Sequence, residues 1–497
     1  MAGGSKLGIR RGLIVIMGVL VVATVMSACG PFRLAGQRCT VAERDAWAHD
    51  NTHLLRCING RWKKSVTIKQ ADAFWAAVKA KKDAENAPPP PPPPSIIHPS
   101  TPAIGSQRST IAAGDSHTCA VRGGLVRCWG SDSTGQLGTS GPDQSSLTPV
   151  TASGITNAVS VTASGLSTCA VLADGTAKCW GSNLNGQLGI GHLGSEAGYS
   201  SISTPTAVVG LTGVVQVEMG PASTCGLRND GTVWCWGIPD AGRLGNNSTN
   251  NPAVTDFLPN DPTNYDSYPT PQGVAGLTGV VSITVGSSHA CGLRGDGTVW
   301  CWGSNGAGQL GNGAGGPGSD PGAKLVAFPV PMRAFSASIT FSGARGISAS
   351  AASTCAMDSA GQALCVGDNS LGLLGFGSGN PILPGFTNVI LQAAATVIGA
   401  TSLSSGGLFN CAPMNTGYVK CWGRNDAGQL GIPYGFSYVA PQTVQGITSA
   451  VEVAGGAQHA CGLRSDNIVF CWGFNGRGQL GDGTTTSHYI AAPVVGL

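Results

Sequence analysis

The chain has 497 residues, of which 42% are hydrophobic, only 11% are charged and 76 are glycine. Soluble domains usually have about 25% charged residues, so this composition favours short strands and tight turns over surface helices. Residues 1–87 hold 14 Lys and Arg against 6 Asp and Glu, a net charge of +8, so the remainder carries −5 of the total of +3. A nucleic-acid-binding domain carries clustered cations, whereas the residues after 87 carry a net negative charge. Nucleic acid is therefore excluded as a partner.

The first predicted element is an export signal over residues 1–28. Cations at its start precede an apolar run over residues 13–26, the order found in a secretory signal peptide. Val25-Met26-Ser27-Ala28-Cys29 resembles a bacterial lipobox, with Met26 where Leu is usual, and this implies that Cys29 is acylated. An uncleaved anchor is the alternative, but the run is shorter than the roughly 20 residues of a spanning helix. We expect an exported, lipid-anchored protein in the periplasm or at the bacterial cell surface.

A small module is predicted over residues 29–87, followed by a linker over residues 88–107. Cys39 and Cys57 can pair with each other and close a small β element that ends at Asn59-Gly60-Arg61-Trp62. Residues 68–87 contain no Gly or Pro and are rich in Ala and Lys, which predicts a helix. Residues 88–94 are an unbroken run of proline, a semi-rigid spacer of roughly 3.1 Å per residue.

Fourteen of the 17 cysteines form seven local pairs, nine residues apart in the first pair and ten in the others. No pair has the CxxC-type spacing or the paired His of a zinc site, and disulfides agree with export. The predicted links are Cys119–Cys128, Cys169–Cys179, Cys225–Cys235, Cys291–Cys301, Cys355–Cys365, Cys411–Cys421 and Cys461–Cys471.

Turn residues explain the difference in spacing. In the ten-residue pairs, Gly or Asn stands six residues after the first Cys, where a three-residue hairpin loop needs a left-handed residue. The first pair has Gly123-Gly124 instead, which suits a two-residue turn. Both loops bring the cysteines face to face at a non-hydrogen-bonded position, about 4.5 Å apart between Cα atoms, within the range that a disulfide bridges.

The cysteine hairpins lie at the centre of a repeat that covers residues 108–497. Each copy also has a strand before the hairpin and a fourth strand-like piece before the next copy, such as residues 206–211 or the end of the chain at residues 493–497. Four short strands per repeat are typical of a propeller blade. Seven copies predict an all-β, seven-bladed β-propeller whose ring closes without an exposed edge.

The repeat resembles that of the RCC1 family. The resemblance rests on an "I-A-x-G" strand, a D-G hairpin and a W-G-x-N-x-x-G-Q-L-G segment, whose last four residues begin at Gly135, Gly186, Gly308, Gly428 and Gly478. The third copy reads Gly242-Arg243-Leu244-Gly245, and the fifth lacks both the Trp and the Gln. The family includes a nuclear exchange factor for a small GTPase and a secreted bacterial inhibitor of β-lactamases. An exported chain does not meet a cytosolic GTPase, so exchange activity is not expected.

Two repeated side chains are possible ligand-binding groups. A Trp follows the second Cys of six hairpins; a ligand-stacking ring is conceivable, but packing between blades accounts for these residues better. His117, His289 and His459 precede the first Cys by two residues in three copies. Three histidines near a channel could bind a metal, but the other copies have Ser or Phe, which favours a structural hydrogen bond. We therefore predict no catalytic residue, no metal and no cofactor.

Long inserts are the best candidates for partner binding. Residues 246–272 and 313–341 occupy the same place in consecutive repeats and should emerge on one side of the ring. Aromatic and Arg residues on adjacent loops suit a protein-binding surface; a tolerated, solvated insertion is the alternative. The candidate contacts are Phe257, Tyr265, Tyr268, Phe328 and Arg333.

The sequence therefore predicts a monomeric, lipid-anchored scaffold that binds a protein or another envelope macromolecule through loops on one face. The alternatives are a proteinaceous enzyme inhibitor, as the RCC1 resemblance allows, and a propeller lyase or hydrolase. No GxSxG, HExxH, Walker or GxGxxG context is present, which makes an enzyme the least favoured of the three.

Overall fold

The computed structural model describes residues 47–49, 53–58, 61–67, 109–140, 144–247, 267–314, 325–333, 340–377, 387–394 and 396–497. Contacts divide the chain into two units, residues 1–99 and residues 100–497. Within these described ranges no helix is both long and apolar enough to cross a bilayer. The predicted signal peptide with Cys29, the helix over residues 68–87 and the proline linker lie outside the described residues.

The N-terminal unit contains one antiparallel sheet in the order β1-β2-β3. Its strands are β1 (Trp47–His49), β2 (His53–Ile58) and β3 (Arg61–Thr67). Cys57 faces Trp62 across the β2–β3 hairpin, so the predicted β element is present there. Its proposed partner Cys39 lies outside the described residues.

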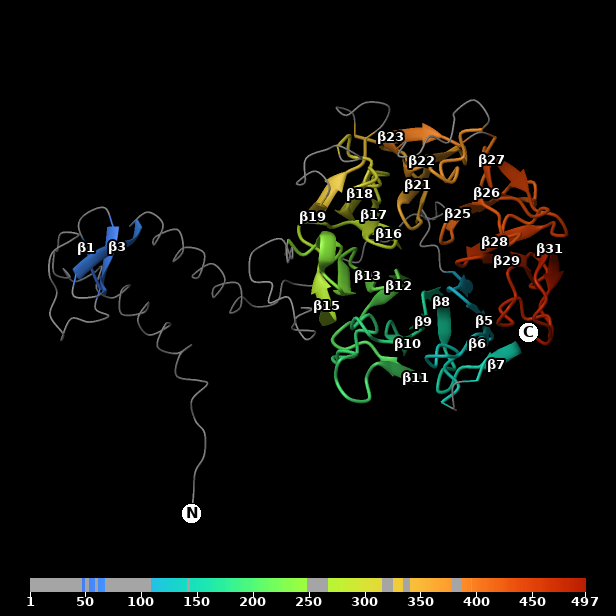
Figure 1. The fold of residues 1–497 in the computed structure, drawn as a ribbon, viewed down its shortest axis with the longest axis horizontal. Helices are drawn as coiled ribbons and strands as arrows, with labels where there is room; N and C mark the ends of the chain where they lie inside the picture. Colours follow the sequence, from blue (N-terminus) through green and yellow to red (C-terminus); the bar gives the residue numbers. More distant parts are fainter. Residues whose placement is uncertain are drawn as a thin grey trace, which may run out of the picture. The chain divides into compact units, whose positions relative to one another are not determined.

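The second unit consists of seven four-stranded antiparallel sheets, which follow one another around a ring in sequence order (Figure 1). From the channel outwards, blades 1 to 3 are β4 (Ile111–Ala113), β5 (His117–Arg122), β6 (Leu125–Gly130), β7 (Ser146–Thr151); β8 (Ala158–Ser164), β9 (Ser167–Leu172), β10 (Ala177–Ser182), β11 (Ser201–Ala207); and β12 (Val214–Met219), β13 (Ser223–Arg228), β14 (Val233–Gly237), β15 (Tyr268–Gly273). A 3-10 turn, η2 (Asp240–Gly242), follows β14.

Blades 4 to 7 have the same construction. Their strands are β16 (Val280–Val285), β17 (His289–Arg294), β18 (Val299–Ser304), β19 (Leu325–Pro331); β20 (Gly346–Ala349), β21 (Ser353–Met357), β22 (Ala363–Asp368), β23 (Thr387–Ala393); β24 (Ser404–Ser405), β25 (Phe409–Pro413), β26 (Val419–Arg424), β27 (Ser437–Thr443); and β28 (Ala450–Gly455), β29 (His459–Arg464), β30 (Val469–Gly473), β31 (His488–Pro493). All four strands of each blade are consecutive in the sequence, so no strand from the other terminus completes a blade.

The predicted hairpins and their disulfides are confirmed. All seven pairs are bonded, with Cα atoms 4.0–4.1 Å apart. Gly175 has φ 76° and Asn467 has φ 66°, the left-handed conformation that the three-residue loop requires. Gly123 and Gly124 also have positive φ, so the shorter first loop restores the same register.

The fourth strand of each blade lies further upstream than the sequence suggested. β11 ends at Ala207 and β31 ends at Pro493, whereas residues 206–211 and 493–497 were predicted to be strands. In blade 2, Val208 and Leu211 follow the strand and are buried in the core between blades. Their hydrophobicity therefore reflects a buried crossover to the next blade, with a turn at Gly210, whose φ is 71°.

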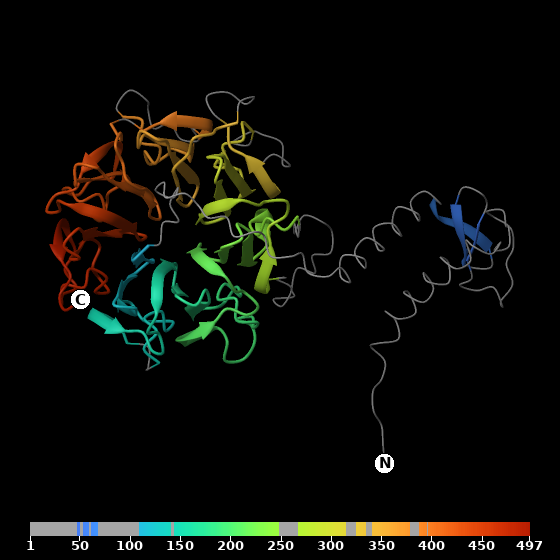
Figure 2. The same ribbon diagram turned by 180° about the vertical axis from the view of Figure 1, so that it is seen from behind.

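The six Trp residues fill the seams between blades, as predicted. Each is fully buried, and each indole Nε1–H donates to a backbone carbonyl oxygen in the preceding blade. The acceptors are Gln479, Gln136, Gln187, Arg243, Leu373 and Gln429. Since the acceptor is a backbone atom, Arg243 and Leu373 can replace Gln. The bond from Trp129 to Gln479 joins blade 1 to blade 7, which lie side by side in both views (Figure 2).

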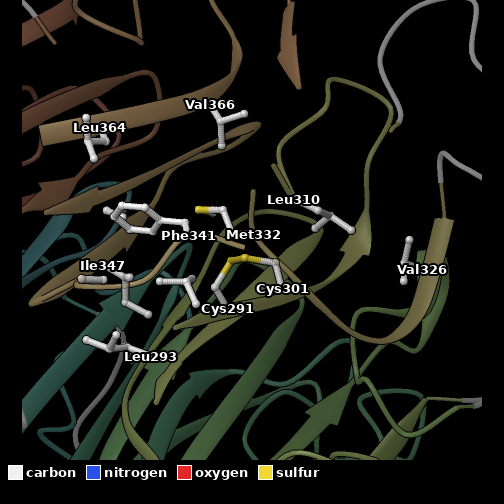
Figure 3. Packing of buried hydrophobic residues seen from close by; sticks show 13 residues of the cluster. Cys291, Leu293, Cys301, Leu310, Val326, Met332, Phe341, Ile347, Leu364 and Val366 are labelled. Carbon is white, nitrogen blue, oxygen red and sulfur yellow. A yellow bond between two sulfur atoms is a disulfide. The ribbon is translucent and has the colours of Figure 1, made fainter. Parts of the chain in front are cut away.

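The seam between blades 4 and 5 is built differently, because blade 5 has Val366 where the other six have Trp. Met332 and Phe341 are buried there with Val366 (Figure 3). A Cβ built on Gly311 would lie 2.9 Å from Met332 Cγ. Gly138 has the equivalent position in blade 1, and there a Cβ would meet the indole of Trp180. Met332 thus occupies the space of the missing Trp.

Candidate binding face, central channel and blade seams

Strand direction gives the ring two distinct faces. The third strand of each blade ends, and the outer strand begins, on one side, which we call the insert face. The cysteine hairpins and the crossovers to the next blade lie on the other side, the hairpin face: the crossover residue Asn157, for example, accepts a backbone hydrogen bond from Ala173 in the next hairpin. On the insert face β14 ends and β15 begins, and the same holds for β18 and β19 and for β22 and β23; residues 248–266, 315–324 and 378–386, between these strands in the sequence, lie outside the described residues.

The candidate contacts on the inserts are only partly placed. Phe257 and Tyr265 lie outside the described residues. Tyr268 is the first residue of β15, opposite Gly237, and is half-buried against the core of blade 3. Phe328 lies within β19. The C-terminal boundaries of both predicted inserts were therefore wrong, because the residues before those boundaries include the outer strands β15 and β19.

Arg333 lies on the other face. It follows the end of β19, where the crossover to blade 5 begins, and its backbone N–H donates to the carbonyl oxygen of Gly311. Its Nη1 donates to Thr340 Oγ1 at 3.0 Å across an isolated bridge. The expectation that the whole of residues 313–341 emerges on one side with residues 246–272 is therefore wrong for Arg333, and for Met332, which is buried.

Two aromatic residues outside the predicted inserts are exposed on the insert face of blade 6. Phe436 is 74% exposed and Tyr434 is 53% exposed, and both lie in the connection between β26 and β27. The rings of Tyr434 and of Tyr489 from blade 7 pack in a T-shaped arrangement, with centroids 5.7 Å apart, and the Tyr434 hydroxyl donates to Ser487 O. This connection has the same place in its repeat as the long inserts. That position in the repeat is the sequence signal that points to Phe436 and Tyr434.

The inner strands of all seven blades line a central channel with a cavity of about 450 Å³. Its walls are mainly Gly, Ala, Ser, Thr and Val, and the charged residues that line it are Asp115, Glu218 and Glu452, from blades 1, 3 and 7. Burial raises the pKa of Asp115. The channel therefore presents acidic and hydroxyl groups without a lining cation among the described residues.

Two of these carboxylates join neighbouring blades. Glu452 accepts hydrogen bonds from the backbone N–H of Thr110 (2.8 Å) and of Ile111 (3.1 Å) and from Thr110 Oγ1 (2.7 Å). Burial raises its pKa, and these donors oppose the rise. Burial also raises the pKa of Glu218 to about 7, although Gln216 Nε2 and Thr162 Oγ1 donate to it. Glu452 thus fixes the start of blade 1 to blade 7.

The three repeated histidines also lie in seams, fully buried. Each Nε2 lies 2.8–2.9 Å from a Thr Oγ1 of the next blade: His117 with Thr168, His289 with Thr354 and His459 with Thr118. Each Thr hydroxyl donates to a backbone carbonyl oxygen, so it accepts from Nε2–H. The Nδ1 atoms have no hydrogen-bond partner among the described residues.

Burial keeps these histidines neutral. It lowers the pKa of His117 and His289 to about 4 and, with the charge of His117, that of His459 to about 3. In the part of the sequence that the structure describes, no three His, Cys, Asp or Glu residues are grouped as metal ligands would be. Each His–Thr contact across a seam thus has the geometry of a structural hydrogen bond, the role that the sequence favours for these histidines.

The fold and its repeat have counterparts in known proteins. The profile of the RCC1-like domain matches residues 153–495, more than half of the chain. The chain belongs to the RCC1-like domain family. Two solved structures have the same fold: Prp20p of Saccharomyces cerevisiae (TM-score 0.60, 19% identity, 76% of this chain and 87% of that one) and human WBSCR16 (TM-score 0.57, 20% identity, 71% and 85%).

Curated RCC1-like relatives match only part of the chain. The probable E3 ubiquitin-protein ligase HERC6 of Homo sapiens is 33% identical over 207 residues, which are 40% of this chain and 19% of HERC6. Protein pim1 of Schizosaccharomyces pombe is 32% identical over 201 residues, 39% of this chain and 36% of pim1. The chain therefore spans well under two thirds of the length of these relatives.

Proposed function

We propose that this RCC1-like propeller is a non-catalytic binding scaffold that engages a protein or another envelope macromolecule through the insert face. The observation that carries the proposal is the exposure of Phe436 and Tyr434, at the repeat position where other blades carry their long inserts. Aromatic side chains dominate binding energy at interfaces. The solved structure of Prp20p was described together with its binding to Gsp1p and histones, which supports a protein as the partner.

The proposal includes export and anchoring. Seven disulfides within one protein favour an oxidising compartment, and the charged, apolar and small-residue order of residues 1–28 suits secretion. Acylation of Cys29 would hold the propeller at the membrane of a bacterial envelope. Labelling cells with a radioactive fatty acid tests this step: the label should enter the wild type and be lost from Cys29→Ser.

A crosslinking capture from native membranes tests the binding face. We expect one stoichiometric partner that is lost from Phe436→Ser and from a variant in which residues 248–266 are replaced by a short Gly-Ser loop. The replacement ends before Tyr268 so that β15 stays intact. Ile398→Ser is the matched control, because Ile398 is 63% exposed but lies in a crossover on the hairpin face.

The pattern of losses decides the outcome. If Ile398→Ser abolishes capture while Phe436→Ser and the loop replacement retain it, the insert face is not the binding face. If a captured enzyme loses turnover on binding, the scaffold acts as an inhibitor through the same face. Turnover by the isolated protein that a single Glu218→Gln or Glu452→Gln change abolishes would contradict a non-catalytic scaffold.

A further inference from the structure

The N-terminal sheet brings most of its cations to one face. Its three strands contain four Arg and Lys residues and neither Asp nor Glu. Arg56 in β2 is paired with Lys63 in β3, and Ile58 is paired with Arg61. Paired residues share a face of a sheet, and so do residues two apart in one strand. Arg56, Arg61 and Lys63 therefore belong to the same face, which we call the cationic face.

The other face of the sheet has a different composition. Cys57 is paired with Trp62, and Leu55 is paired with Lys64. That face thus combines three residues of types that are often buried with a single cation. On the cationic face Arg61 is exposed, so at least this part of the face is in contact with solvent.

The pairing of two cations across the β2–β3 hairpin is unfavourable in an isolated sheet. Directly opposite residues of an antiparallel pair have Cβ atoms about 4.5–5.5 Å apart, and like charges at such positions are destabilising. Arg56 and Lys63 occupy such positions, and the three strands contain no acidic residue that offsets them. A bound anion would reduce the repulsion, so the register of the hairpin points to an anionic ligand.

The spread of the cationic face matches a charged surface better than a single small anion. Arg61 and Lys63 are two residues apart in β3, a rise of about 7 Å. Trp47 in β1 is paired with Arg56, so the face extends across all three strands. Cations distributed over a sheet face suit a planar array of phosphate groups, and tryptophan is enriched where membrane and water meet.

The place of the sheet in the chain favours a lipid surface over an acidic protein. Residues 30–46 separate Cys29 from Trp47, and a fully extended chain of about 17 residues spans at most about 60 Å. If Cys29 is acylated, as proposed above, the sheet stays within that distance of the headgroups. A cationic surface then adds to the affinity that the acyl anchor supplies. The nearness of the membrane thus rests on the proposed function, whereas the charge of the face does not.

We propose that the cationic face of the N-terminal sheet binds the anionic headgroups of a membrane, as a contact separate from the acyl anchor. The negative charge of the headgroups offsets that of Arg56 and Lys63, which are opposite each other in the hairpin. Arg61 and Trp47 extend the same face along β3 and onto β1. Because the attraction is electrostatic, the binding weakens as the salt concentration rises.

Vesicle sedimentation of the unacylated chain, residues 30–497, tests the surface without the anchor. The chain should bind vesicles of phosphatidylglycerol and phosphatidylcholine in equal parts and should not bind vesicles of phosphatidylcholine alone. The double variant Arg56→Gln with Lys63→Gln should bind about 25-fold more weakly, because each cation near an anionic surface contributes about fivefold. Lys64→Gln is the matched control, since it removes one charge from the same strand on the other face; it should change the affinity by less than about twofold.

Lys63→Arg provides the second variant: it keeps the charge and should keep the binding, and hydrogen exchange over residues 53–67 at the wild-type rate shows that each variant is folded. Equal binding to both kinds of vesicle would overturn the proposal, and so would equal losses in Lys64→Gln and in the double variant.

The other sources of negative charge give distinct results. Binding to polyglutamate but not to the vesicles would overturn the proposal and assign an acidic polypeptide as the partner. Stronger competition by inorganic phosphate than by sodium chloride of equal ionic strength would overturn it in favour of a site for free phosphate. Vesicle binding by a protein whose Cys29 takes up no fatty acid would refute the anchoring and leave the cationic face supported.

Discussion

Trp129 donates its indole Nε1–H to the backbone carbonyl oxygen of Gln479, 350 residues later in the sequence, at 2.9 Å. The first and last blades are thus joined by the same bond that joins five other pairs of neighbouring blades. All seven disulfides lie within hairpins, so none of them crosses this junction. The closure of the ring therefore depends on non-covalent contacts, among them those of Trp129, Glu452 and His459.

We expect Trp129→Phe to weaken the closure specifically. The change keeps most of the buried ring but removes the N–H donor, which should lower the free energy of unfolding by about 1–3 kcal/mol. Hydrogen exchange should show faster opening of blades 1 and 7 than in Trp180→Phe, the matched change at a seam where the polypeptide is continuous. Identical exchange in the two variants would contradict a special weakness at the closure.

The buried histidines should make the protein sensitive to acid. Unfolded histidine binds a proton near pH 6.5, whereas the lowered pKa of His117 means that it binds one only near pH 4, so the unfolded state binds more protons between these values. The stability that neutral, buried His117 contributes is fully present above about pH 6.5 and is lost as the pH drops towards 4. For a pKa shift of this size, the free energy of unfolding falls by about 3 kcal/mol.

A natural seam of this propeller supplies the variant that tests the acid sensitivity. Phe409 and Ala460 take the places of His and Thr between blades 6 and 7. The double variant His459→Phe with Thr118→Ala should therefore fold, and its urea midpoint should fall less between pH 7 and pH 4.5 than that of the wild type. An unchanged pH dependence would show that His459 does not contribute to the acid sensitivity.

Glu218 should have the opposite dependence. Its pKa is raised to about 7, so the folded state binds more protons than the unfolded state between about pH 4.5 and 7, and its contribution to stability falls as the pH rises through this window. Glu218→Gln removes the buried charge and should raise the free energy of unfolding by about 1–3 kcal/mol at pH 8, and by little at pH 4.5. A difference in melting temperature that does not grow with pH would contradict the burial of this charge.

Met332→Ala tests the seam between blades 4 and 5. Because Met332 fills the space of the missing Trp and is fully buried, its truncation should cost about 2–5 kcal/mol. Ile398→Ala, at an exposed crossover position, should change the free energy by less than about 0.5 kcal/mol. Denaturant unfolding of the two variants distinguishes a core residue from an insert residue.

The fold was predictable because the signals that specify it are local and repeated. The spacing of Cys169 and Cys179, with Gly175 between them, determines the hairpin register without knowledge of any other blade. The outer strands were misplaced because Val208 and Leu211 are hydrophobic for a tertiary reason, burial against the next blade. The prediction placed Arg333 on the wrong face for a different reason: residues 313–341 show no repeat pattern that would separate the insert from the outer strand β19 and the crossover after it.

The candidate site was less predictable than the fold. The pairing of His459 with Thr118 depends on ring closure, which brings together residues 341 positions apart. Phe436 was overlooked because its connection is short, although its repeat position was known.

The oxidation state of the hairpin cysteines tests the central claim most directly, because the disulfides close the blades and indicate a location outside the cytoplasm. The measurement is a thiol titration of the mature protein, purified from its native host under alkylating conditions and denatured without reduction. We predict that none of the 14 hairpin cysteines reacts. Fourteen or more free thiols would contradict the account.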